Sequence, residues 1–333
     1  MGRPVFYMAD SGFTGDLKKN NSETSKLMFS LKEFIGRGLI FVILTGCGSS
    51  GENIPSDRFD KGTINISADE SFKPVIDSQV QVYEAKYPGV KLKVNYKPEA
   101  DCLKDLAVDS VRMIIVTRRF TPQEKDFLLD SMKVSPEQLP LAFDAIAVIV
   151  HPEAKVQLFT MKDIREILTG KFVKNLIPVF DGLKATSTVR FIVDSVLRGD
   201  SLTNKSLAAR SSEEVINYVS KNPMAVGFIG VSWIGNQEDE QQQSFLTKVK
   251  LAEIESTDLP GKYIQPVQAN IYNGRYPMIR ELVYILKENH RSGLGHGFKN
   301  FMIGEKGQLI FRRAYLVPAH LQFNVRPATL REE

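Results

Sequence analysis

The 333-residue sequence contains little cysteine, histidine or tryptophan. Its two cysteines, Cys47 and Cys102, exclude a disulfide framework and a cysteine-rich metal site. Its four histidines show no HxxxH or HExxH spacing, and the chain contains no P-loop, no Gly-x-Ser-x-Gly motif and no dinucleotide fingerprint. We therefore expect no catalytic activity, metal ion or cofactor. A net charge of only +4 argues against a dedicated nucleic-acid-binding protein.

The N-terminal part has the pattern of a targeting segment. Residues 32–37 carry two basic side chains, residues 38–44 are apolar, and Leu44-Thr45-Gly46-Cys47 follows. The apolar run is too short to span a bilayer permanently, so the pattern predicts a secretory signal. The last four residues resemble a bacterial lipobox, which implies cleavage before Cys47 and a lipid on its thiol. The alternative is a buried strand that ends at a cysteine by chance.

Residues 1–27 precede this signal and are polar, whereas a signal peptide normally begins near the start codon. Met28 would give a compact signal, and we interpret it as the start of translation in place of Met1. On either start, residues 1–46 form an upstream extension plus a signal peptide, and residues 47–61 form a lipid-anchored tether.

From residue 62 onward, predicted strands alternate with predicted helices, which is typical of an α/β fold. The helices are expected around residues 72–86, 103–106, 122–132, 161–169, 189–197, 213–221, 294–303 and 305–314. The strands are expected at 63–67, 90–96, 113–116, 145–150, 177–180, 225–229, 248–254 and 281–286. The first strand, helix and strand form a βαβ unit, which predicts a parallel sheet. Residues 236–244 are polar and predict a surface loop, and Ser212 is expected to cap the helix that follows it.

Three hydroxyl residues, Thr186, Ser187 and Thr188, open the helix that follows the strand at 177–180. Such residues cap free backbone N–H groups, and a helix start of this kind can also bind an anion. Arg190 lies in the first turn, where a cation is unfavourable for the helix dipole. The segment is therefore either an ordinary capped helix with a solvated arginine or one half of an oxyanion site.

Several segments, taken in order, resemble the periplasmic phosphate-binding proteins, which are the receptor subunits of phosphate ABC importers. They are Ser71-Phe72, Met113–Glu124, Phe159–Gly170, Thr186–Thr188, Asn222–Gly230, Tyr276-Pro277 and Gly304–Gln308. The resemblance covers residues 62 to 320. It implies a two-lobed type II solute-binding fold with a ligand cleft between the lobes. Lobe I would comprise residues 62–145 and 255–325, and lobe II would comprise residues 146–254.

By the same resemblance, ligand contacts are expected from both lobes. The candidate residues are Ser71, Phe72, Thr117, Arg118, Thr186, Ser187, Thr188 and Arg190. The sequence departs from the family's pattern at Arg118, where the family has an aspartate. Cys102 and Trp233 are expected to be core residues, and His151 is expected to have a structural role.

The resemblance thus implies a lipid-anchored, monomeric protein of the periplasm or cell envelope. It would bind phosphate or a related oxyanion and present it to the membrane permease of an ABC importer. The alternative is a non-transport lipoprotein that reuses the fold as an anion sensor or as an assembly and interaction module.

Overall fold

Five strands of a ten-stranded mixed sheet form the part of the molecule that contains the first predicted βαβ unit. The computed structural model describes residues 57–133, 135–182, 186–288 and 290–321, so the predicted signal peptide and Cys47 lie outside the described residues. The strands lie in the order β2-β1-β3-β12-β4. Their bounds are β1 (Lys61–Asp69), β2 (Gly89–Lys97), β3 (Val111–Val116), β4 (Glu137–Val150) and β12 (Ile279–Leu286).

The predicted parallel sheet is confirmed for only three of these strands. β1 pairs in parallel with β2 and with β3, as the βαβ unit requires. β12, however, lies between β3 and β4 and is antiparallel to both. The sheet is therefore mixed.

Strand β4 continues beyond this group of strands into a second group. Its first part, up to Ala145, pairs with β12, and its second part, from Ile146, pairs with β8. Beyond β4 the order is β8 (Ala225–Gly230), β6 (Ile177–Phe180) and β7 (Leu207–Ala208). We refer to β1, β2, β3, β12 and the first part of β4 as the β1 side, and to β6, β7, β8 and the second part of β4 as the β6 side.

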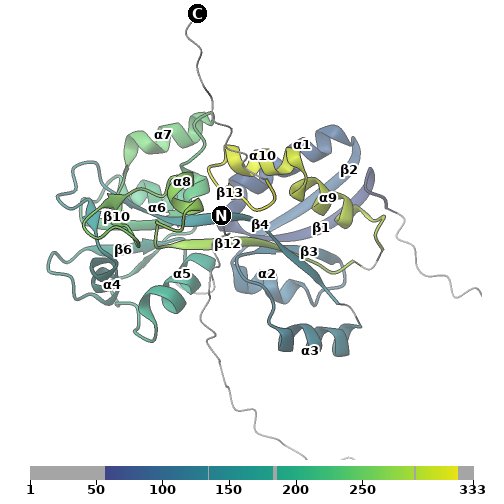
Figure 1. Cartoon of the computed structure of the whole chain (residues 1–333), viewed down its shortest axis with the longest axis horizontal. Helices are drawn as coiled ribbons and strands as arrows, with labels where there is room; N and C mark the ends of the chain where they lie inside the picture. The colour runs from purple at the N-terminus through teal and green to yellow at the C-terminus, as the bar shows by residue number, and fades with distance from the viewer. Residues whose placement is uncertain (1–56, 134, 183–185, 289, 322–333) are drawn as a thin grey trace, which may run out of the picture. The chain divides into compact units, whose positions relative to one another are not determined.

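Helices cover both faces of the β1 side (Figure 1). α1 (Lys73–Lys86), α9 (Leu294–Ile303) and α10 (Glu305–Arg313) pack on one face, and α2 (Glu99–Asp105) packs on the other with α3 (Pro122–Met132) beside it. Around the β6 side lie α4 (Met161–Thr169), α5 (Ser187–Phe191), its π-helical continuation (Ile192–Leu197) and α6 (Ser212–Val219). None of the helices in the described ranges is both long and apolar enough to span a bilayer.

Smaller elements complete the fold. Strands β5 (Leu158–Phe159), β10 (Glu253–Glu255) and β11 (Tyr263–Ile264) form a separate small sheet. Short 3-10 turns occupy Glu70–Phe72 and Val231–Trp233, and α8 (Gln268–Tyr272) precedes β12. The remaining short strands, β9 (Lys250–Leu251) and β13 (Val317–Pro318), both pair with β4.

Four predictions about secondary structure are wrong. The strand expected at 145–150 begins eight residues earlier, at Glu137, so that β4 includes Asp144. The polar segment 236–244 is not all loop, because α7 (Glu240–Lys248) begins within it and buries Phe245. The single strand expected at 248–254 is two short strands, β9 and β10, which belong to different sheets. The cap of α6 is Ser211 and not Ser212, since the Ser211 side chain accepts the hydrogen bond from the Glu214 amide.

Candidate functional site

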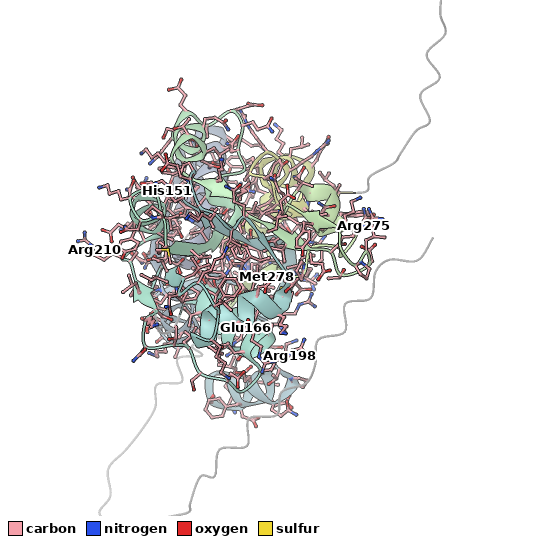
Figure 2. The ribbon with its side chains drawn as sticks, turned by 90° about the vertical axis from the view of Figure 1, so that its left-hand side faces the viewer. His151, Glu166, Arg198, Arg210, Arg275 and Met278 are labelled. Carbon is pink, nitrogen blue, oxygen red and sulfur yellow. The ribbon has the colours of Figure 1, made fainter. Side chains whose placement is uncertain are left out.

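The guanidinium of Arg280 is buried in the interior of the fold. Arg280 belongs to β12 and Asp144 to β4, and the two residues are direct partners across the antiparallel ladder. Both side chains are buried, and Nε of Arg280 donates to Oδ2 of Asp144 at 2.8 Å. The guanidinium carbon also lies 4.8 Å from the centre of the Phe72 ring. Arg280 thus lies at the place where β4 passes from the β1 side to the β6 side. Figure 2 shows Met278, which precedes Arg280 by two residues, near the centre of the molecule, whereas Arg210 and Arg275 lie at its edges.

Two hydroxyl groups from the start of α5 contact the same guanidinium. Nη1 of Arg280 donates to Oγ of Ser187 at 2.9 Å and to Oγ1 of Thr188 at 3.2 Å. Thr186 precedes them, and its Oγ1 accepts a hydrogen bond from the Val189 amide at 3.3 Å, so it is the N-cap. Nη2 of Arg280 is buried and makes no hydrogen bond to any described residue.

Ser71 joins the two sides of the molecule. Its Oγ donates to Oδ2 of Asp181 at 3.2 Å and lies 3.5 Å from Oγ of Ser187. Its carbonyl oxygen accepts a hydrogen bond of 2.8 Å from Nε1 of Trp233. Because Ser71 follows β1 and the other three residues belong to the β6 side, these contacts hold the two sides together directly.

Two further buried carboxylates accompany Asp144 in this region. Asp69 accepts a hydrogen bond from the Ser71 amide, and Asp181 accepts one from Oγ of Ser212 at 3.1 Å. Burial raises the pKa of Asp69 to about 6, with a further increase from Glu99 and an opposing effect of Arg280. Burial likewise raises the pKa values of Asp144 and Asp181 against the lowering effect of Arg280. We call Asp69, Asp144, Asp181 and Arg280 the Asp/Arg cluster.

A second polar group connects α5 to α2 and to the end of β3. Nε of Arg190 forms an ion pair with Oε2 of Glu99, and its Nη2 donates to Oγ1 of Thr117 at 2.8 Å. Oε1 of Glu99 accepts hydrogen bonds of 2.7 Å from both the amide and the hydroxyl of Thr117. Although burial acts in the opposite direction, Arg190 and Thr117 lower the pKa of Glu99. Glu99 is therefore a buried carboxylate with a matched cation.

Comparisons with known proteins assign the family. A family model described as the PBP superfamily domain matches residues 54–306. The chain belongs to the PBP superfamily. It is 22% identical to the phosphate-binding protein PstS of Staphylococcus saprophyticus over 273 residues, and the matched region covers 78% of this chain and 80% of that protein. It is 19% identical to PstS of Pseudomonas aeruginosa over 281 residues, and the matched region covers 77% of this chain and 83% of that protein.

Among solved structures, the chain is similar to a putative phosphate ABC transporter substrate-binding protein from Clostridium perfringens that contains bound phosphate. The TM-score is 0.63 at 20% identity, over 78% of this chain and 100% of the other. The expected two-lobed PBP fold and the resemblance to phosphate-binding proteins are therefore confirmed.

Within this PBP fold, the predicted ligand residues fall into separate groups. Ser71, Phe72, Ser187 and Thr188 converge on Arg280, as their hydrogen bonds and ring contact show. Thr186 adjoins them as the helix cap, while Thr117 and Arg190 belong to the neighbouring group around Glu99.

Arg118 lies apart from these groups. Its guanidinium forms a two-point ion pair with Glu124 at 2.9 and 3.0 Å, at the start of α3. The predicted core positions of Cys102 and Trp233 are confirmed, since both side chains are buried, and Trp233 additionally donates to the Ser71 carbonyl.

Sequence reasoning missed Arg280, Asp144 and Asp181. A signal for the first two was present, because each is a charged residue on the face of a strand whose other side chains are apolar and buried. A charge in such a position is expected to have a partner, since an unpaired buried charge is costly. Asp181 directly follows the strand at 177–180, in the stretch of polar residues that leads to Thr186.

Proposed function

We propose that this PBP-family chain is an extracytoplasmic receptor that captures inorganic phosphate between its lobes and presents it to the permease of an ABC importer. The observation that carries the proposal is the buried Nη2 group of Arg280, which has no hydrogen-bond partner among the described residues. A buried donor of this kind favours a ligand that accepts hydrogen bonds. The names of the PstS relatives and the phosphate bound in the C. perfringens structure support phosphate as that ligand.

The proposed ligand groups come from three segments of the chain. Arg280 supplies the positive charge, and its planar guanidinium suits a tetrahedral oxyanion. Ser71, Ser187 and Thr188 supply hydroxyl donors within the same cluster. Because all four residues are buried, their hydrogen bonds to an anion would form in a medium of low dielectric, where they are strongest. Arg190 and Thr117 would border the ligand rather than bind it, since both contact the Glu99 carboxylate and neither hydrogen-bonds to a residue of the Asp/Arg cluster.

Titration calorimetry of the purified full-length protein tests this function. We expect saturable binding of phosphate, and a loss of affinity of about 10- to 100-fold in Arg280→Gln, from the value of a charged hydrogen bond. Arg165→Gln is the matched control, because Arg165 pairs with Asp200 on the surface, and it should leave the affinity unchanged. Sulfate and molybdate are titrated in parallel. Absence of phosphate binding at millimolar concentration would refute the proposed ligand.

The proposed location depends on Cys47, which would carry the lipid that anchors the receptor at the cell envelope. Expression of the full chain and of Cys47→Ser in a bacterium, followed by detergent phase partitioning, tests this step. The unchanged chain should enter the detergent phase and the variant should remain in the aqueous phase. Equal partitioning of the two proteins would contradict the anchor.

One observation favours the alternative role as a non-transport sensor or interaction module. Direct hydrogen bonds from Ser71 to Asp181 and Trp233 already join the two sides of the molecule. A protein whose two sides are joined in this way does not need a ligand to bring them together. Permease and ATPase genes beside the gene for this chain would favour transport, and a folded protein that binds none of the tested anions would favour the alternative.

A further inference from the structure

Among the described residues, negative charge exceeds positive charge around the proposed ligand groups. Asp69, Asp144 and Asp181 are each buried, and Arg280 is the cation that faces them from β12. One oxygen of each carboxylate makes no hydrogen bond to a described residue, namely Oδ2 of Asp69, Oδ1 of Asp144 and Oδ1 of Asp181. Three carboxylates thus share one guanidinium, and each keeps an unused acceptor inside the protein.

Among the described residues, the surrounding elements add no further free cation to this balance. The other titratable groups that face the cluster are Glu70 from the turn after β1, Glu99 and Cys102 from α2, Arg190 from α5 and Tyr276 from the segment before β12. Glu99 and Arg190 compensate each other as an ion pair. Glu70 adds another carboxyl group, and its pKa is raised to about 7 by burial and by the nearby Asp181 and Asp69.

An anion that enters this site adds negative charge beside the three carboxylates. Like charges in a buried site disfavour ionisation, so a carboxylate there tends to take up a proton when an anion arrives. The proton comes from solvent and binds to a carboxylate oxygen, which converts an acceptor into an O–H donor. An oxygen that has no partner in the ligand-free protein could then donate to the anion.

We propose that anion capture at this site is coupled to proton uptake by Asp69 and Asp181, so that the receptor loads its ligand at mildly acidic pH and releases it as the pH rises. Asp144 is excluded from this role because it remains the partner of Arg280. The inference rests on the proposed function and adds regulation by pH to the same site. Burial raises the pKa of Asp69 to about 6 and raises that of Asp181 as well, and both shifts favour the protonated carboxyl group.

Calorimetry of the full-length protein with phosphate, in buffers of different ionisation enthalpy, measures the protons taken up per anion. After correction for the ionisation of phosphate itself, we expect an uptake of up to about one proton near pH 6.5. The corrected affinity should fall by up to about tenfold per pH unit above that value, as linkage to one proton requires.

Asp69→Asn and Asp181→Asn imitate the protonated carboxyl group and should reduce the proton uptake and flatten the pH profile. Asp200→Asn is the matched control, because Asp200 is an exposed partner of Arg165, and it should keep the profile of the unchanged protein. Two outcomes would overturn the coupling but not the proposed function. One is phosphate binding without proton uptake beyond that of phosphate itself, and the other is an unchanged pH profile of the affinity in both Asp69→Asn and Asp181→Asn. Failure to bind any oxyanion overturns the proposed function and the coupling together.

Discussion

Replacement of Arg280 by methionine removes the guanidinium but keeps an unbranched apolar side chain in its place. The change leaves Asp144 as a buried charge without its ion-pair partner, since both side chains are buried and lie 2.8 Å apart. Removal of one member of a buried ion pair typically costs about 3–5 kcal/mol. We therefore expect Arg280→Met to lower the free energy of unfolding by about that amount at pH 7.5.

The loss should depend on pH in a defined direction. Burial already raises the pKa of Asp144, and Arg280 opposes this increase. Without the guanidinium, the pKa of Asp144 rises further, so that its carboxyl group takes up a proton at mildly acidic pH and the buried charge disappears. The difference in unfolding free energy between Arg280→Met and the unchanged protein should therefore be smaller at pH 5.5 than at pH 7.5.

Urea unfolding followed by the fluorescence of Trp233, the single tryptophan, measures this difference. Arg119→Met is the matched control, because Arg119 pairs with Glu281 in a partly exposed ion pair beside the same strand. Its expected cost is about 0–1 kcal/mol. If Arg280→Met does not fold, the double variant Arg280→Met/Asp144→Asn, which removes both charges, should recover folding. A loss below about 1 kcal/mol in Arg280→Met, or an equal loss at both pH values, would refute the reasoning.

Three further predictions concern the same framework. The pKa of Asp69 is raised from 3.8 to about 6. Between these two pH values the folded state therefore holds a proton that the unfolded state has lost. The unfolding free energy of the ligand-free protein should fall as the pH rises through about 6. Urea titrations at pH 5.5 and 7.5 should show this fall, and a loss of the difference in Asp69→Asn would assign it. Glu99→Gln should cost about 1–3 kcal/mol in urea unfolding, because it removes charge-assisted hydrogen bonds from Arg190, whereas Glu124→Gln at the exposed start of α3 should cost less than about 1 kcal/mol. Thr160→Ala should lower the thermal midpoint through a loss of about 1 kcal/mol, because the Thr160 side chain caps α4, and an unchanged midpoint would contradict that role.

Local patterns in the sequence were sufficient to predict most of the secondary structure. The bounds of α3, α9 and β6 agree with the predicted ranges, because capping residues and apolar periodicity determine them within one segment. The cap at Thr186 could be predicted for the same reason. Segment 236–244 was misread because its glutamine-rich composition hides a helix that buries only a few side chains.

The pairing of the charged residues in the candidate site could not be predicted in this way. Arg280 and Asp144 are 136 residues apart in sequence and meet only through the register of β12 on β4. The strand predicted to begin at Glu281 started one residue too late to include Arg280. Arg190 and Arg118 were identified from sequence as possible anion ligands, yet the nearest carboxylates, Glu99 and Glu124, pair with them in the fold. The pair of Arg190 and Glu99 depends on tertiary structure, because the two residues are 91 positions apart, whereas Arg118 and Glu124 are only six positions apart.

The place of β12 in the sheet has a consequence for how the chain folds during synthesis. β12 lies between β3 and β4, although it is made long after both. Until residues 279–286 leave the ribosome, no strand connects β3 with β4, and the guanidinium that neutralises Asp144 is missing. Contacts between such distant segments form slowly. The β1 side should therefore remain incomplete until β12 has been synthesised, and its central strand pairing is among the last contacts of the fold to form.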